Sequence, residues 1–306
     1  MGTVSFLGTT NFITRHPVAI YYFLVFVISW GGLLLLIGPG GISGIMVETG
    51  RNALWLSVVL VTLAGPSTAG ILSTFLVQGR GGLREFLSRL GLWRVGARWY
   101  AVAVLTAPLS VFATLLALSS FSPAYLPGIF VIHDKFSLLL FGLAAGVLAP
   151  FFEELGWTGF AIPQMSKGHS LLATGLFVGI LWGAWHFLSN LWGVGPLSET
   201  VPLTVFMIPF LFSWLLPYRV LMVWVYDHTK SIFVNMVMHW SLVAFWLIAT
   251  PIGSAGVNLV TWYIAWAAVL WGIAGVVVLK ESRVKVPATI TQQAVAKIEV
   301  ESKQHR

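Results

Sequence analysis

The sequence predicts an all-α membrane protein of about eight transmembrane helices, with an active site buried between the helices. Of its 306 residues, 58% are hydrophobic and only 9% are charged, whereas a soluble domain usually carries about 25% charged residues. Aromatic residues make up 14% of the chain, as expected for a protein with aromatic belts at the membrane interfaces. A third observation points to the site: two adjacent carboxylates, Glu153 and Glu154, lie inside an apolar run at residues 136–160.

Eight apolar stretches are long enough to cross a bilayer, whose hydrocarbon core requires about 20 residues of helix. The sixth stretch is the least regular, because Pro209, Pro217 and Arg219 interrupt it. Residues 1–280 are expected to form the transmembrane domain and residues 281–306 a polar cytoplasmic tail. No cleavable signal peptide is expected, because the first apolar run is too long and no small-residue cleavage site follows it. The eight stretches are residues 17–37, 53–77, 99–120, 136–160, 171–191, 201–225, 231–250 and 258–279.

The distribution of basic residues predicts how the spans are oriented. With eight spans both termini lie on one side, and that side holds 15 of the 17 lysines and arginines, Arg219 included. Arg51 and Lys135 fall on the other side. Because cytoplasmic loops carry the excess of lysine and arginine, we expect a multi-pass protein of the cell membrane with both termini in the cytoplasm. The net charge of +7 is thus explained by topology in a lipid bilayer, and no nucleic-acid partner is expected.

A shorter amphipathic segment is predicted between the second and third spans, at residues 79–100. Its apolar residues recur at helical spacing with arginines between them, which is typical of a helix lying on the cytoplasmic leaflet. Anchoring at the interface is favoured over a role in docking substrate. The apolar residues are Leu83, Phe86, Leu87, Leu90 and Trp93.

Four ionisable residues inside the spans are the candidate catalytic residues: Glu153, Glu154, His186 and His239. An ionisable group at membrane depth costs roughly 2.5–3.5 kcal/mol on insertion scales, so two adjacent ones are hard to explain as packing. A single histidine in an apolar helix is more often structural than catalytic. Two histidines and a glutamate pair on three spans, however, can supply one another's hydrogen-bond partners.

Such a set of side chains points to hydrolysis. A carboxylate in a low-dielectric site can act as a general base toward water, and a neutral imidazole can orient that water or accept a proton. The same residue types can bind zinc, in which case Glu153, His186 and His239 are the expected ligands. The chain has no cysteine, no HExxH motif and no GxSxG motif, which excludes thiolate chemistry, a zincin site and a nucleophile elbow.

The depths of these residues agree only in part. At a rise of 1.5 Å per residue, Glu154 lies roughly 9 Å and His239 roughly 12 Å from the cytoplasmic ends of their predicted spans. His186 lies roughly 22 Å from the corresponding end. A fifth span that begins later than Leu171, or a tilted helix, would reconcile these values. The site is expected to open toward the cytoplasmic half of the bilayer.

Three short motifs follow one another along the chain: EELGWT from Glu153, WGAWH ending at His186, and HWSLV from His239. Their order resembles the EExxxR, FxxxH and HxxxN motifs of the CPBP family of intramembrane proteases. This family is related to the type II CAAX prenyl endopeptidases and to bacteriocin-processing and immunity proteins. The resemblance implies that Glu153 and His186 activate a water molecule and that His239 polarises the scissile carbonyl. It leaves open whether the enzyme uses zinc or a metal-free glutamate mechanism.

The chain departs from these motifs at two positions. Thr158 stands where the family has arginine, so Glu154 is expected to be either protonated or held by another donor. Val243 stands where the family has asparagine. Asn235, one turn before His239 on the same helical face, is a candidate replacement. A hydrogen bond between helices is an equally weighted role for Asn235.

Small and aromatic residues around the motifs are interpreted as packing residues. The glycines allow neighbouring helices to approach closely, and the tryptophans fill the space between helices or line a substrate groove. They are Gly156, Gly159, Gly179 and Gly183, with Trp157, Trp182 and Trp185.

The leading functional hypothesis is an intramembrane endopeptidase that acts on membrane-associated or prenylated peptides. A first alternative is a catalytically weakened member of the same family that serves as an immunity or scaffold protein, as the losses at Thr158 and Val243 suggest. A second alternative is a proton-coupled transporter, in which the glutamates and histidines form a relay. Paired broken helices, which many transporters contain, are absent from the predicted pattern.

Overall fold

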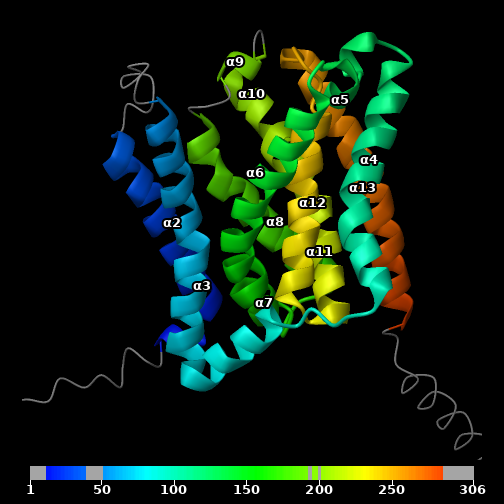
Figure 1. Cartoon of the computed structure of the whole chain (residues 1–306). Coiled ribbons are helices and arrows are strands. Elements are labelled where there is room, and N and C mark those ends of the chain that lie inside the picture. The colour runs from blue at the N-terminus through cyan, green and yellow to red at the C-terminus, as the bar shows by residue number, and fades with distance from the viewer. Residues whose placement is uncertain (1–11, 39–50, 192–194, 199–200, 285–306) are drawn as a thin grey trace, which may run out of the picture.

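The computed structural model describes residues 12–38, 51–191, 195–198 and 201–284. Within these ranges every regular element is helical, and eight helical segments are long and apolar enough to cross a membrane (Figure 1). The predicted fold class and number of spans are therefore confirmed. The longer helices are α2 (Pro17–Ile37), α3 (Arg51–Leu90), α4 (Ala97–Ser119), α6 (Lys135–Gly156), α8 (Leu171–Leu191), α11 (Leu215–Thr229), α12 (Ile232–Ala249) and α13 (Gly256–Val284). The shorter helical elements are η3 (Pro123–Tyr125), α5 (Gly128–Val131), η4 (Trp157–Ala161), α7 (Ile162–Met165), α9 (Gly195–Ser198), α10 (Leu203–Ile208) and η5 (Pro209–Ser213).

The bundle has a central group of helices, α6, α8, α11 and α12, with α2 and α3 on one side and α4 and α13 on the other (Figure 1). α12 packs against α6 and α4, α11 packs against α8, and α3 packs against both α2 and α6. α11 and α12 are joined tightly: Lys230 ends α11 in the left-handed conformation (φ 52°), and the Ser231 side chain then caps α12 by accepting from the Val234 N–H at 3.1 Å. The central helices carry the candidate site residues.

Two spans are built from consecutive helical segments joined by a π-helical turn. The fourth span continues past its predicted end at residue 160, through η4 and α7, to Met165. The sixth span combines α10, the π-helical η5 and α11, which matches the irregularity predicted for it. π-Helical turns are rare and often lie at functional sites. Here both turns flank the candidate site.

The amphipathic helix predicted within residues 79–100 is the second half of α3, which ends at Leu90, so Trp93 lies beyond the helix. A bend at Gly79, with φ 64° and ψ −156°, separates it from the membrane span, in a backbone conformation that glycine adopts readily. Beyond the bend, α3 runs across the end of the bundle (Figure 1). Phe86 is buried at 3% exposure, whereas Leu87 and Trp93 are more than half exposed. The amphipathic character is confirmed, and contact with lipid stays a prediction.

We call the end of the bundle that carries the second half of α3 the arginine-rich face. Its arginines lie on α3, on the connection to α4 and at the start of α4. The opposite face carries α5 and the start of α6. The chain is thus a multi-pass membrane protein, while the cytoplasmic location of its termini stays a prediction. Most of the polar tail predicted at 281–306 lies outside the described residues. The arginines of the face are Arg80, Arg84, Arg89, Arg94 and Arg98.

Glycines set the spacing of the helices beside the glutamate pair, as the sequence predicts. A Cβ atom on Gly156 would overlap the backbone carbonyl of Pro66, so α3 and α6 touch backbone to backbone. A Cβ atom on Gly183 would lie 2.6 Å from the Leu211 carbonyl oxygen, which brings α8 equally close to η5. Both contacts exclude any larger side chain.

Candidate active site

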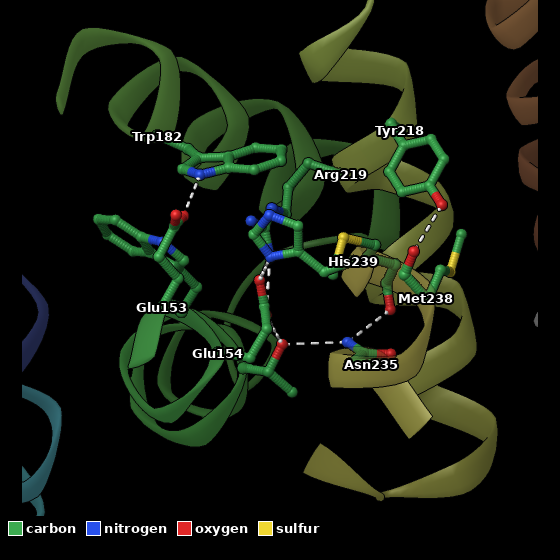
Figure 2. Close-up of polar contacts among 11 residues, drawn as sticks. Glu153, Glu154, Trp182, Tyr218, Arg219, Asn235, Met238 and His239 are labelled. Carbon is green, nitrogen blue, oxygen red and sulfur yellow. Dashed lines mark hydrogen bonds and ion pairs between the residues drawn. The ribbon is translucent and has the colours of Figure 1, made fainter. Parts of the chain in front are cut away.

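Glu153 and Glu154 occupy the last turn of α6, directly before the π-helical η4. Both side chains are buried, at 2% and 0% exposure. Being adjacent on one helix, they point in different directions and meet different partners (Figure 2). This divergence gives the two carboxylates different chemical environments.

Glu154 is held by donors from three other elements. Arg219 Nη1 of α11 donates to both carboxylate oxygens at 3.0 Å, and His239 Nδ1 of α12 lies 2.8 Å from Oε1. The Thr158 hydroxyl donates to Oε2. Arg219 is fully buried and its guanidinium lies 4.0 Å from the centroid of the Trp182 ring. The ion pair and the cation–π contact together offset part of the cost of burying these charges.

The position of Arg219 bears on two predictions, the count of cytoplasmic basic residues and the donor expected for Glu154. Counting it among the cytoplasmic basic residues is wrong, because its side chain lies between helices at the level of the site. Fourteen of the other 16 basic residues remain on the predicted cytoplasmic side, so the predicted orientation is unchanged. At the same time, Arg219 is the donor that Glu154 is expected to find in place of the motif arginine. Sequence reasoning did not assign this role to it.

Glu153 is held by two indoles. Trp182 Nε1 of α8 donates to its Oε2 at 2.6 Å, and Trp157 Nε1 of η4 donates to the same oxygen at 3.2 Å. Both tryptophans are buried. Because they are neutral donors, they orient the Glu153 carboxylate without neutralising its charge.

Glu153, His186 and His239 line one cavity of about 210 Å³. Three of the four predicted catalytic residues are thus brought together from α6, α8 and α12. Glu154 is not part of the lining and lies behind His239, which it contacts. The remaining lining is largely aromatic and aliphatic, with one further polar side chain. It consists of Ala149, Trp182, Asn190, Phe210, Leu211, Trp214, Leu215, Leu242, Val243 and Trp246.

Hydrogen bonds define which nitrogen of each histidine carries a proton. His186 Nδ1 lies 3.0 Å from the backbone carbonyl oxygen of Trp182, which can only accept, so Nδ1 is the protonated nitrogen. His239 Nδ1 faces the Glu154 carboxylate in the same way. In both rings Nε2 is therefore the nitrogen that can be offered to water or substrate.

The longer fourth span changes the predicted depth of the site. α8 does begin at Leu171, so the explanation that the fifth span starts later is wrong. Instead, the fourth span ends at Met165, 11 residues after Glu154, which puts this residue roughly 17 Å from that end. A hydrocarbon core is about 30 Å thick. If the span crosses such a core, this distance corresponds to the middle of the bilayer, whereas the expected opening toward the cytoplasmic half stays a prediction.

Asn235 does not replace the asparagine that the third motif lacks. Its Nδ2 donates to Thr158 Oγ1 at 3.0 Å and to the Met222 carbonyl oxygen at 3.1 Å, and the residue is fully buried outside the cavity lining (Figure 2). The prediction of a replacement is therefore wrong, and the alternative of a hydrogen bond between helices is confirmed. Val243 lines the cavity, so the polar group is missing from the site itself.

Asn190 is a cavity residue that sequence reasoning missed. It lies four residues after His186 on α8, and its Nδ2 donates to the His186 carbonyl oxygen at 2.8 Å. Residues four apart share a helical face. That spacing is the signal in the sequence that could have identified it.

A zinc site needs donor groups that converge on one point. The residue types suit zinc. Among the described residues, however, no three histidine, aspartate or glutamate side chains converge closely enough to hold a metal ion. Glu153 Oε2 already accepts two indole N–H groups. Zinc binding by Glu153, His186 and His239 stays an untested alternative, and the mechanism proposed below routes no step through a metal.

The carboxylates and imidazoles of the site lie in the part of the chain that resembles known proteins. Residues 135–245, which include all four candidate residues, match the family described as Type II CAAX prenyl endopeptidase Rce1-like. The chain is also 31% identical over 137 residues to the CAAX prenyl protease 2 of Methanococcus maripaludis. Both matches support a relationship of the chain to the CPBP/CAAX protease family. The match covers 42% of this chain and 49% of the relative, so it spans about half of that protein.

Proposed function

We propose that the chain is an intramembrane endopeptidase that hydrolyses a peptide bond with a water molecule activated by Glu153 and His186. The observation that carries this proposal is that Glu153, His186 and His239 line one cavity. A carboxylate and two imidazoles that face one confined space are the components needed for general acid–base hydrolysis of an amide. The similarity of residues 135–245 to a family of proteases supports the same reaction.

In the first step Glu153 acts as the general base. The indoles of Trp157 and Trp182 fix its carboxylate, so it can take a proton from a water molecule without first having to reorient. The water oxygen then bonds to the carbonyl carbon, and the electron pair of the C=O π bond moves to oxygen. His186, protonated at Nδ1, can accept a hydrogen bond from the same water at Nε2 and align it.

His239 stabilises the negative oxygen that forms. Its Nδ1–H is held by Glu154, so a proton on Nε2 would give an imidazolium that donates to the oxyanion. Glu153, Glu154 and Arg219 together carry two negative charges and one positive charge, which a protonated His239 would balance. When the intermediate collapses, the C–N bond breaks and Glu153 passes its proton to the departing nitrogen. Water is the only co-reactant.

The size and lining of the cavity favour a peptide with apolar residues beside the scissile bond. Its volume of about 210 Å³ is below the ~300–1,000 Å³ of pockets that enclose drug-sized ligands. It therefore fits the residues that flank the cleaved bond, and the rest of a membrane-anchored substrate would lie along the helices or in lipid. The aromatic side chains of Phe210, Trp214 and Trp246 provide apolar walls.

The test is cleavage of quenched-fluorescent peptides by purified protein in lipid nanodiscs, with anchored, prenylated and unmodified versions of each peptide. Glu153→Gln and His186→Ala are each expected to lower kcat by about 10²–10⁴-fold, the usual contribution of general acid–base groups. Glu85→Gln, which makes the same change on an exposed carboxylate of α3, should leave cleavage unchanged. Cleavage that survives both site substitutions would refute the mechanism.

One observation favours a second candidate, a catalytically weakened family member with an immunity or scaffold role. Val243 puts an aliphatic side chain on the cavity wall where the motif has a polar one. The same assay separates the two functions. A folded wild-type protein that cleaves none of the peptides, and gains cleavage when Val243 is changed to asparagine, would support the second candidate.

A further inference from the structure

The cavity extends from Glu153 toward one face of the bundle only. Asn190 lies one residue before the end of α8 at Leu191, and Trp246 lies three residues before the end of α12 at Ala249. Phe210 follows the start of α10 by seven residues. The lining therefore runs from the middle of the bundle to the ends of α8, α10 and α12 that lie away from the arginine-rich face.

Toward the arginine-rich face the site is closed by packed side chains. The polar network of Glu154, Thr158 and Asn235 is fully buried. Beside it, Trp157 and Phe160 of η4 are 0% and 1% exposed. The second half of α3 covers η4, with Phe86 packed against Gly159 and Arg89 bonded to the Gly159 carbonyl oxygen at 3.1 Å. A peptide would have to separate these contacts to enter from that face.

Distances along α8 lead to the same conclusion. His186 lies five residues before the end of α8, or roughly 8 Å, but 15 residues after its start, or roughly 22 Å. His186 and Asn190 are partly exposed, whereas Glu154, Arg219 and Asn235 are not. Water and substrate therefore have a short path to the site from the face that carries α5.

The charges indicate which side of the membrane that face meets. Five arginines lie on or next to the second half of α3, at Arg80, Arg84, Arg89, Arg94 and Arg98, and Lys167 lies in the loop between α7 and α8 on the same side. The ends of α6, α8, α10 and α12 surround the cavity mouth. Among the described residues, Lys135 is the one lysine or arginine near these helix ends. By the positive-inside rule, the cavity mouth is on the non-cytoplasmic side.

We propose that the site receives its substrates from the non-cytoplasmic side of the membrane. The substrate class would be membrane-anchored peptides whose scissile bond is exposed on that side, such as segments already translocated across the bilayer. A lipid-modified tail on a cytoplasmic protein would meet the closed, arginine-rich face instead. The nature of the substrate rests on the proposed function, but the direction of access does not.

Because the natural sequence contains no cysteine, single introduced cysteines can test the direction of access. Three single variants would be expressed in intact cells and exposed to a membrane-impermeant maleimide before and after permeabilisation. Val243→Cys reports on the cavity, Ser88→Cys on the arginine-rich face and Ser120→Cys on the opposite face. Asn190→Cys is a second cavity reporter in case Val243→Cys does not fold.

Labelling of the cavity reporter and of Ser120→Cys is expected in intact cells, whereas Ser88→Cys should be labelled only after permeabilisation. The proposal is overturned if the cavity reporter behaves like Ser88→Cys, if it is labelled under neither condition, or if Ser88→Cys is labelled in intact cells. Labelling requires no catalysis. A protein that follows the expected pattern but cleaves no peptide would therefore retain this access route while the proposed protease function fails.

Discussion

Arg219 and Glu154 form a buried ion pair across 65 residues of sequence, with Arg219 Nη1 at 3.0 Å from both carboxylate oxygens. In the family motif, an arginine one turn after the glutamate would occupy the position of Thr158. Here the positive charge comes from α11 instead, and the Thr158 hydroxyl adds a further hydrogen bond. The change at Thr158 therefore does not leave Glu154 unpaired. The case for a weakened enzyme rests on Val243.

Removing the arginine should strongly destabilise the bundle. Arg219→Met would leave the fully buried Glu154 carboxylate without its charged partner. Breaking a buried ion pair from one side costs roughly 3–5 kcal/mol. The measurement is thermal unfolding of the purified protein in detergent, where a clearly lower midpoint is expected.

A second substitution separates the loss of the pair from the loss of packing. In the double variant Glu154→Gln with Arg219→Met neither partner is charged, so we expect it to be more stable than Arg219→Met alone. Coupling between contacting residues is typically about 0.5–3 kcal/mol. Strictly additive effects of the two substitutions would contradict the ion pair as the source of the stability.

The close contact of α3 with α6 leads to a second prediction about the stability of the bundle. Gly156→Ala would introduce a methyl group where the Pro66 carbonyl already lies, and overpacking of this kind costs about 1–3 kcal/mol. Gly275→Ala on α13 is the matched control, because a Cβ atom there has no neighbour within 4 Å. It should be neutral or stabilise the helix by up to about 1 kcal/mol. Equal unfolding midpoints for the two variants would show that the contact carries no strain.

Membrane helices can be predicted from the sequence because a lipid core requires an apolar run of sufficient length. The backbone hydrogen bonds of that run must be made within the helix. The bounds of α2 and α8 are therefore predicted to the residue. Glu153, His186 and His239 could be identified as candidate site residues because ionisable groups in such apolar runs are costly and usually functional. Their gathering around one cavity then follows from the packing of α6, α8 and α12.

The parts that were not predicted depend on contacts between distant segments. The π-helical turns η4 and η5 lengthen two spans, and no local residue pattern specifies them. Arg219 is counted on the cytoplasmic side by sequence reasoning, although the predicted sixth span, residues 201–225, contains it. The apolar residues on both sides of Arg219, at 215–226, were the available sign that it lies inside one. For Asn235, helical spacing predicts the face that it shares with His239. It does not predict the hydrogen bonds of Asn235 to Thr158 and to the Met222 carbonyl oxygen.

The arrangement of donors predicts that catalysis resists chelation. Among the described residues no three potential ligands converge on a metal position, and the proposed steps need only Glu153, the two histidines and water. Peptide cleavage should therefore persist after incubation with EDTA or 1,10-phenanthroline. Metal content of the purified protein should be measured in the same preparation. Stoichiometric zinc together with loss of cleavage on chelation, restored by added zinc, would establish the metal site that the sequence left open.

Polar groups on the cavity wall should control the rate of cleavage. Val243→Asn would add an amide one turn after His239 on the cavity lining, and Asn190 is the amide already there. One well-placed donor to an oxyanion is worth about 10²–10³ in kcat, so Val243→Asn should raise kcat and Asn190→Leu should lower it. Val243→Leu, which changes bulk without adding a donor, is the control. A rise with Val243→Leu equal to that with Val243→Asn would assign the effect to cavity shape, and unchanged kcat in Asn190→Leu would remove Asn190 from the reaction.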